Sequence, residues 1–340
     1  MGVTTVLENT ILGRIAGRVR KSKLLNITLV FLLMVIIAIL TSKNFLTKFN
    51  IQSVVRDLAF VSIIAIGQSC LLLLGELDLS VGKMSSLSGV LAGLMMVNAG
   101  ISPAITLVCC LLFGACFGLI NGTIITRLRL NAMVVTIGMQ GVYGGINLVI
   151  TKGKAIVNIP QGIQFLGKGN LFGIPLPFVL TLVILAVVLF LTQQTTFGRY
   201  IYAIGNNREA VGILGINVDM VRTLTYGLVG ALSALTGILM VARLGASQPS
   251  IGDSWVMNSI AASVIGGVAL TGGIGSPAGA VLGAAIISII QNMIVLFGVN
   301  VYWQTAVSGV VVVLAISFDS VSTIIAAGNS RRKALAKKRT

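Results

Sequence analysis

Histidine is missing from this 340-residue sequence, and acidic residues are scarce, with 8 Asp and Glu against 24 Lys and Arg. The absence of histidine removes the most common metal ligand and the most common general base. The four cysteines (Cys70, Cys109, Cys110 and Cys116) lie inside apolar runs without C-x-x-C spacing, so we interpret them as packing residues. We therefore predict no catalytic residue and no metal site, which argues against a metalloprotease, a histidine-activated nucleophile or a haem protein.

Charge is also sparse, because charged residues make up only 9% of the chain and hydrophobic residues 56%. Soluble domains carry roughly 25% charged residues, so the composition indicates an integral membrane protein. The apolar runs approach the ~20 residues that a helix needs to cross a bilayer, and the ~10-residue alternation of barrel strands is not seen. We predict an all-α polytopic membrane protein with about ten transmembrane helices in two five-helix halves.

The predicted spans define a transmembrane domain over residues 24–322, between a polar segment at 1–23 and a basic tail at 323–340. The first run is longer than the apolar region of a signal peptide, and no A-x-A-like site follows, which favours a retained anchor. The ten spans are 24–40, 58–74, 84–99, 104–123, 132–150, 178–193, 224–242, 256–270, 278–297 and 305–322.

The distribution of Lys and Arg predicts the orientation. If the N-terminus is cytoplasmic, 17 of the 24 basic residues, Lys83 among them, fall on the inner side and 7 on the outer side. The positive-inside rule then places both termini in the cytoplasm. The basic residues gather at the termini and in short loops without aromatic interleaving, so membrane topology explains the net charge of +16 better than nucleic-acid binding.

Glycine contributes 40 residues and recurs at four-residue spacing. Because lipid provides no hydrophobic drive for helix association, small residues permit the close backbone contacts that hold membrane helices together. We predict that most of these glycines are structural, and that one glycine face could form a homodimer. The spaced sets are Gly114, Gly118 and Gly122; Gly141 and Gly145; and Gly275, Gly279 and Gly283.

The longest polar stretch between the first and last spans is the inner polar loop, residues 194–222. We predict a short helix over 207–214 within it, with Asn206 as N-cap, Glu209 completing a capping box and Gly215 ending the helix. Ala210, Val211, Ile213 and Leu214 then need an apolar surface, which a docked partner or the lipid headgroups would each provide.

A possible internal repeat relates Leu74–Gly82 to Leu244–Gly252 at an offset of 170 residues. With five spans in each half the repeat would be inverted, although chance matches in a glycine-rich chain are an alternative. Both copies place polar residues between two short spans, where a broken helix would line a pathway. We predict a gate there, with Asp78 capping the helix that opens near Ser80; direct contact of Glu76 or Asp78 with substrate is the weaker hypothesis. The predicted gate residues are Glu76, Asp78, Ser80, Gly82, Gln248 and Ser250.

The segment Gly266–Gly275 is also rich in glycine, but no GxxxxGK[ST] motif occurs anywhere in the chain. We interpret it as a tight inner reversal between two spans. Tyr302 and Trp303 lie at the outer end of the last span, where an aromatic belt or a partner contact is expected.

Four motifs resemble the membrane permeases of ribose/galactose-type carbohydrate ABC importers, and together they cover nearly the whole chain. They are GRYIYAIGNNREAVGILGI (198–216), GELDLSVG (75–82), LTGGIG (270–275) and GVNVYWQ (298–304). Val211 departs from the pattern, because the family usually has a second Ala there. The resemblance implies that the short helix of the inner polar loop docks on an ATPase subunit through Gly205, Asn206, Asn207, Glu209, Ala210, Val211 and Gly215.

The resemblance further implies a non-catalytic transport subunit in the bacterial inner membrane. A cytosolic ATPase would use the ATP, this chain would bind no cofactor, a periplasmic binding protein would deliver a sugar, and a second permease subunit, expected to be identical, would complete the pathway. Two alternatives remain at this point. One is an ABC permease for nucleosides, a signalling furanose or branched amino acids; the other is an ion-coupled secondary transporter, for which broken helices would be equally natural.

Overall fold

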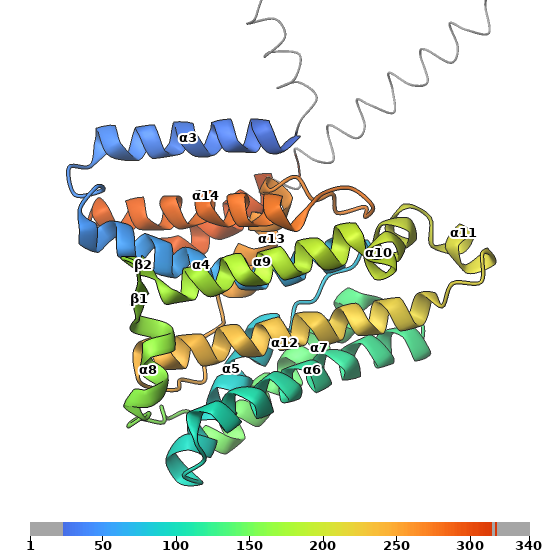
Figure 1. Cartoon of the computed structure of the whole chain (residues 1–340), viewed down its shortest axis with the longest axis horizontal. Helices are drawn as coiled ribbons and strands as arrows, with labels where there is room; N and C mark the ends of the chain where they lie inside the picture. The colour runs from blue at the N-terminus through green and yellow to red at the C-terminus, as the bar shows by residue number, and fades with distance from the viewer. Residues whose placement is uncertain (1–22, 315–316, 318–340) are drawn as a thin grey trace, which may run out of the picture.

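The protein is a bundle of helices in the computed structural model, which describes residues 23–314 and residue 317 (Figure 1). The only strands in this part of the chain form a two-stranded antiparallel hairpin, β1 and β2. The elements are α3 (Lys23–Thr41), α4 (Lys48–Leu73), α5 (Val81–Gly93), the π-helical turn η1 (Leu94–Asn98), α6 (Pro103–Arg127), α7 (Ala132–Thr151), α8 (Gln161–Lys168), β1 (Asn170–Leu171), β2 (Ile174–Pro175), α9 (Leu176–Gln194), α10 (Thr196–Asn206), α11 (Arg208–Ile213), α12 (Val218–Leu244), α13 (Trp255–Ile265), α14 (Pro277–Leu296) and a last helix, Trp303–Leu314.

Within the described residues, seven helices are long and apolar enough to cross a membrane, which confirms the all-α polytopic class. The other three predicted spans correspond to shorter helices. The span 84–99 is α5 with η1, the span 256–270 is α13, and the span 305–322 begins as Trp303–Leu314 and continues beyond the described residues. At 1.5 Å per residue, an 11-residue helix such as α13 covers only about 17 Å of a ~30 Å hydrocarbon core.

Both short helices follow a stretch of irregular chain. Gly75 ends α4 and Gly245 ends α12, each with a positive φ, 76° and 69° respectively, that favours glycine. The chain then re-enters the bundle before α5 and α13 begin. The two halves touch at Gly82 of α5 and Gly252, in the irregular chain just before α13, where a Cβ on either glycine would overlap the carbonyl oxygen of the other. A two-fold relation between the halves would produce this contact; the inverted repeat itself stays a prediction.

The two most buried long helices are α4 and α12, which lie at the centre of the bundle. Helix α12 packs against α5 and α6, and α4 packs against α13 and α14. By contrast, α3, α6, α7 and α9 expose most of their surface, and this surface is apolar. These outer helices therefore present the face that the lipid solvates.

Glycine contacts hold two of the helix pairs together. A Cβ at Gly114, Gly118 or Gly122 on α6 would collide with α12, and one at Gly279 or Gly283 on α14 would collide with the segment Ala262–Gly266 of α13. The second set behaves differently, because nothing lies within 4 Å of a Cβ at Gly141 or Gly145 of α7. Close packing thus explains the first and third sequence sets but not the α7 set.

Several sequence-based boundaries need correction. The second predicted span starts too late at residue 58, because α4 begins at Lys48, capped by Thr47, and continues without a break to Leu73. The inner polar loop contains two helices, α10 and α11, instead of one. Lys83, which was counted with the inner loops, lies in the first turn of α5 and pairs with Asp253. The segments 1–22 and 318–340 lie outside the described residues.

We predict that Gly118→Ala destabilises the protein, because its methyl group would overlap the backbone of Tyr226 on α12 and force the helices apart. Gly141→Ala is the matched control: nothing lies within 4 Å of a Cβ at that position, and alanine favours a helix over glycine by about 1 kcal/mol. The check is thermal unfolding of both purified variants in detergent. A Gly118→Ala melting temperature equal to wild type would contradict the packing argument.

Candidate functional site

Helix α11 is a six-residue helix on a projecting loop at one end of the bundle, opposite α8 and the hairpin (Figure 1). Its N-cap is Asn207, whose side chain accepts a hydrogen bond from the backbone N–H of Ala210 at 3.0 Å. The prediction of Asn206 as N-cap is therefore wrong by one residue, and the capping box with Glu209 fails with it. Asn206 instead ends α10 and donates to the carbonyl of Tyr202. Gly215 does end the segment, with a φ of 80°.

The apolar residues of α11 divide into an anchor and a free face. Val211 is 5% exposed and packs on the bundle, whereas Ile213 and Leu214 are 87% and 77% exposed. Ala210 is exposed on the same helix. Since a helix this short is unstable in isolation, Val211 and the ion pairs described next must fix its position. The exposed face is then available to a partner.

Glu76 links α11 to the centre of the bundle. Its Oε1 lies 3.2 Å from the Arg208 guanidinium of α11 and 2.5 Å from that of Arg222 on α12. The Glu76 and Arg222 side chains are only 9% and 7% exposed, whereas Arg208 is 48% exposed. Partial burial, followed by the neighbouring Arg222 charge, lowers the pKa of Arg208. The Glu76 carboxylate is thus largely buried. Arg222 holds it in place, and the more exposed Arg208 connects it to α11.

Two residues beyond Glu76, the Asp78 carboxylate organises the start of α5. Its Oδ1 accepts from the Ser80 backbone N–H at 2.7 Å and from the Ser80 hydroxyl at 2.6 Å. Asn121 of α6 donates to Asp78 Oδ2 and to the Ser80 hydroxyl, and Tyr143 of α7 donates to Asn121. Asp78 therefore binds the N-cap residue Ser80, one step before the first-turn N–H groups that were predicted as its partners. The short segment 76–80 therefore connects α5, α6 and α7 to the end of the bundle that carries α11.

The end of α4, the end of α10 and the turn at 266–275 meet beside this network. The backbone N–H of Gly273 donates to the Leu73 carbonyl at 2.9 Å, and a Cβ at Gly205 would overlap that same carbonyl. Tyr202 of α10 donates to the carbonyl of Gly275. The glycine-rich reversal at 266–275 is thus a compact turn against α4 and α10, and Gly205 is a contact between α10 and this turn.

The second broken segment is held by residues of the first half. The Ser86 hydroxyl donates to the Pro249 carbonyl at 2.6 Å, and Asn147 of α7 donates to the same carbonyl at 3.0 Å. The exposed Gln248 and Ser250 accept bonds only through their backbone carbonyls within the described chain. Among the predicted gate residues, Glu76, Asp78 and Ser80 form one connected site, while Gly82 belongs to the helix crossing.

Sequence reasoning missed Arg222, Asn121, Tyr143 and Asn147, which complete these networks. Arg222 was counted only as an inner positive charge. The sequence did indicate the two asparagines, because Asn121 and Asn147 lie inside apolar runs and a buried amide needs hydrogen-bond partners.

Comparison with known proteins gives three findings. The family described as "Branched-chain amino acid transport system / permease component" matches residues 50–316. The ribose import permease protein of Bacillus subtilis is 36% identical over 291 residues, 85% of this chain and 90% of that protein, and the Escherichia coli K12 protein of the same name is 33% identical over 85% and 91%. The autoinducer 2 import system permease protein LsrC of Escherichia coli O9:H4 is 32% identical over 87% and 86%. No solved structure matches significantly.

We predict that Glu76→Gln lowers the free energy of unfolding by about 3 kcal/mol, because it leaves the buried Arg222 guanidinium with only the exposed and more distant Asp219 carboxylate as counter-charge. The matched control is Asp219→Asn, since Asp219 is 66% exposed and lies 3.4 Å from the same arginine; its loss should cost less than about 1 kcal/mol. Thermal unfolding in detergent measures both. Equal losses in the two variants would mean that Glu76 does not hold α12.

Proposed function

Because this chain belongs to the permease family of branched-chain amino acid transport systems, we propose that it is the membrane-spanning subunit of a bacterial ABC importer for a monosaccharide. The support for a sugar comes from the relatives, two of which are ribose import permeases that match this chain over most of both lengths. A multi-pass bundle of apolar helices agrees with a transport subunit. The family description alone would leave the solute open.

The observation that carries the proposal is the exposed apolar face of α11. Ile213 and Leu214 project from a helix that Val211 and Arg208 attach to the bundle. Exposed apolar groups on a short anchored helix favour a protein partner, since burying them there excludes water from both surfaces. The partner is a cytosolic ATPase, which binds the ATP; this chain has no phosphate-loop motif and contributes no catalytic residue.

Movement of α11 has a direct route to the broken helix α5. A pull on α11 acts on Arg208, then on Glu76, and through the chain segment 76–80 on the start of α5. Arg222 carries the same displacement to α12. In this mechanism ATP-driven closure of the ATPase shifts the half-helices, and the pathway alternates between its inner and outer openings.

The remaining assignments follow from this one. The chain lies in the inner membrane with both termini in the cytoplasm, so that α11 faces the ATPase. The opposite end, which carries α8 and the hairpin, receives the periplasmic binding protein with its sugar (Figure 1). A second permease subunit, an identical chain, completes the pathway.

Reconstitution into proteoliposomes tests the transport class. With the cognate ATPase and binding protein, we expect D-ribose or D-galactose uptake that requires ATP. A proton or sodium gradient alone should drive none. Uptake driven by such a gradient without the ATPase would instead establish an ion-coupled transporter, and uptake of L-leucine in place of either sugar would establish an amino-acid importer.

A charge on the exposed face of α11 tests the docking surface. We expect Ala210→Glu to abolish co-purification of the ATPase, because the carboxylate would have to lose its water in an apolar contact. Leu128→Glu is the matched control: Leu128 is 63% exposed in the α6–α7 loop, which the arginines on either side place on the inner face. Retention of the ATPase in Ala210→Glu, with coupled uptake, would contradict the proposal.

A further inference from the structure

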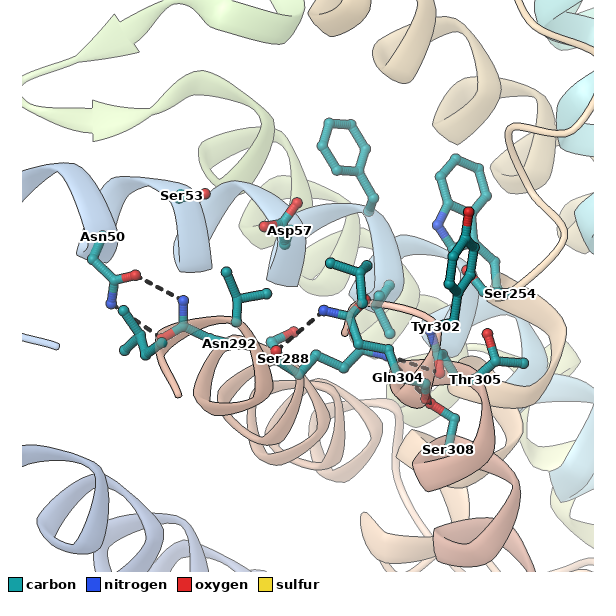
Figure 2. A pocket seen from close by; sticks show the side chains of 18 of the residues that line it. Asn50, Ser53, Asp57, Ser254, Ser288, Asn292, Tyr302, Gln304, Thr305 and Ser308 are labelled. Carbon is teal, nitrogen blue, oxygen red and sulfur yellow. Dashed lines mark hydrogen bonds between the residues drawn. The ribbon is translucent and has the colours of Figure 1, made fainter. Parts of the chain in front are cut away.

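A cavity of about 820 Å³ lies between α4, α13, α14 and the last helix, at the end of the bundle opposite α11 (Figures 1 and 2). Cavities of roughly 300–1,000 Å³ accommodate small-molecule ligands, and a monosaccharide is smaller than most of these. The polar side chains of the lining come from Asn44, Thr47, Asn50, Ser53, Asp57, Ser254, Asn258, Ser288, Gln291, Asn292, Gln304, Thr305 and Ser308, with Tyr302 at one side.

The cavity leads inward from the surface. Phe49 and Tyr302 are 85% and 86% exposed, which places them at the mouth. Phe60, Asn258 and Ser288 are all less than 5% exposed, so they form the deep part. Beyond this depth, Gly266 and Gly283 pack tightly between α13 and α14. The cavity is therefore open at the outer end and closed toward the coupling end.

Amide and hydroxyl groups in the cavity are already oriented by bonds to each other. Gln291 Nε2 donates to Asn258 Oδ1 at 3.2 Å and to the Ser308 hydroxyl at 3.3 Å. Asn50 and Asn292 exchange two hydrogen bonds at the other side, which Figure 2 shows as paired dashed lines. This network fixes side chains that line the cavity.

Some polar groups remain free to bind a ligand. The Ser288 hydroxyl is buried and has no hydrogen-bond partner within the described chain. Gln291 Oε1 and Asn258 Nδ2 make none of the hydrogen bonds found among the described residues. A buried hydroxyl without a partner is costly, so a ligand or water that bonds to it is favoured. Oriented donors and acceptors of this kind match a molecule rich in hydroxyl groups.

The charge of the lining excludes an ionic ligand. Among the described residues of the lining, Asp57 is the one acidic or basic residue, and its carboxylate forms an ion pair with Arg243 of α12 at 2.5 Å. The Arg243 guanidinium also lies 5.3 Å from the centre of the Phe60 ring. Because the pair is neutral overall, no uncompensated charge is left for a phosphate, an ammonium group or a carboxylate.

Two aromatic rings form the inner wall. Phe60 and Trp255 lie parallel, with centroids 6.4 Å apart and an interplanar angle of 7°. Trp255 is the first residue of α13, so this half-helix contributes one of the two rings. An aromatic face packs against the C–H groups of a sugar ring, while the amides bond to its hydroxyls.

We propose that this cavity is the outer binding subsite for a neutral monosaccharide on its way through the bundle. The proposal rests on the importer function above and adds the residues that contact the sugar. Gln291, Asn258 and Ser288 bind hydroxyl groups, and the Trp255 face packs on the ring. The predicted gate acids Glu76 and Asp78 lie at the other end and do not line this site.

The test is D-ribose and D-galactose uptake by the reconstituted importer with Asn258→Leu, Gln291→Leu or Ser288→Phe. The first two remove hydrogen-bonding groups at similar size, and the third fills the deep part of the cavity. We expect each maximal rate to fall about tenfold, the loss of one to two hydrogen bonds. The KM should stay unchanged because the binding protein sets it. Gln193→Leu on α9, outside the cavity lining, is the matched control and should transport at the wild-type rate.

Two additional measurements separate the outcomes. Co-purification of the ATPase and ATP hydrolysis stimulated by the binding protein show whether each variant folds and couples; where one does not, Gln304→Leu and Thr305→Val, nearer the mouth, replace it. Wild-type maximal rates in the folded cavity variants would overturn the subsite while leaving the importer intact. If the wild-type importer hydrolyses ATP but carries neither sugar, the ligand class is wrong.

Discussion

The fold depends on satisfying backbone hydrogen bonds where no water is available. Two stretches of irregular chain, 74–80 and 245–254, enter the bundle and interrupt its regular helices. Hydrocarbon offers their N–H and C=O groups no partners, so irregular backbone is tolerated there only where other protein groups supply the bonds or a cavity admits water. In the first stretch, Asp78 accepts from the Ser80 N–H, and the Gly75 and Glu76 N–H groups bond back to α4. In the second, Ser86 and Asn147 donate to the Pro249 carbonyl, and Ser247 pairs with the backbone of Ile156. These bonds allow helices α5 and α13 to begin inside the protein.

This arrangement places two half-helices between the inner and outer ends of the molecule. Glu76 joins the chain ahead of α5 to the exposed face of α11. Trp255, at the start of α13, forms part of the cavity wall, and Asp253 beside it pairs with Lys83 of α5. The Glu76–Arg208 pair thus lies at the chain leading into α5, and the Lys83–Asp253 pair joins α5 to the chain leading into α13. In the proposed mechanism, these contacts are the route by which a displacement of α11 reaches the cavity.

Composition and the length of the apolar runs predicted the membrane class and the approximate positions of the spans. The four-residue spacing of glycines predicted small residues between helices. The anchor of α11 was not predicted, because the sequence presents Val211, Ile213 and Leu214 as one apolar set, whereas the structure buries Val211 and exposes the other two. Which asparagine caps α11 depended on where α10 ends, and that is decided by the contact of Gly205 with the Leu73 carbonyl, 132 residues earlier in the chain. A local sequence pattern cannot predict a contact between residues so far apart in the chain.

The partners of Glu76 and the cavity lining were hidden for the same reason. Arg222 looked like one more inner positive charge, because its pairing with Glu76 requires α12 to lie against the end of α4. The cavity gathers residues from α4, α12, α13, α14 and the last helix, and no single segment carries its polarity. Amides such as Gln291 and Asn258 resemble isolated polar exceptions in apolar runs until the fold brings them together.

Gly82 of α5 touches Gly252, in the chain just ahead of α13, and a Cβ on either glycine would overlap the carbonyl oxygen of the other. No side chain can stand between the two segments at this point, so the first half of the chain rests directly on the second. In the proposed mechanism, a stroke delivered to the half bearing Glu76 is passed through this backbone contact to the half bearing Trp255.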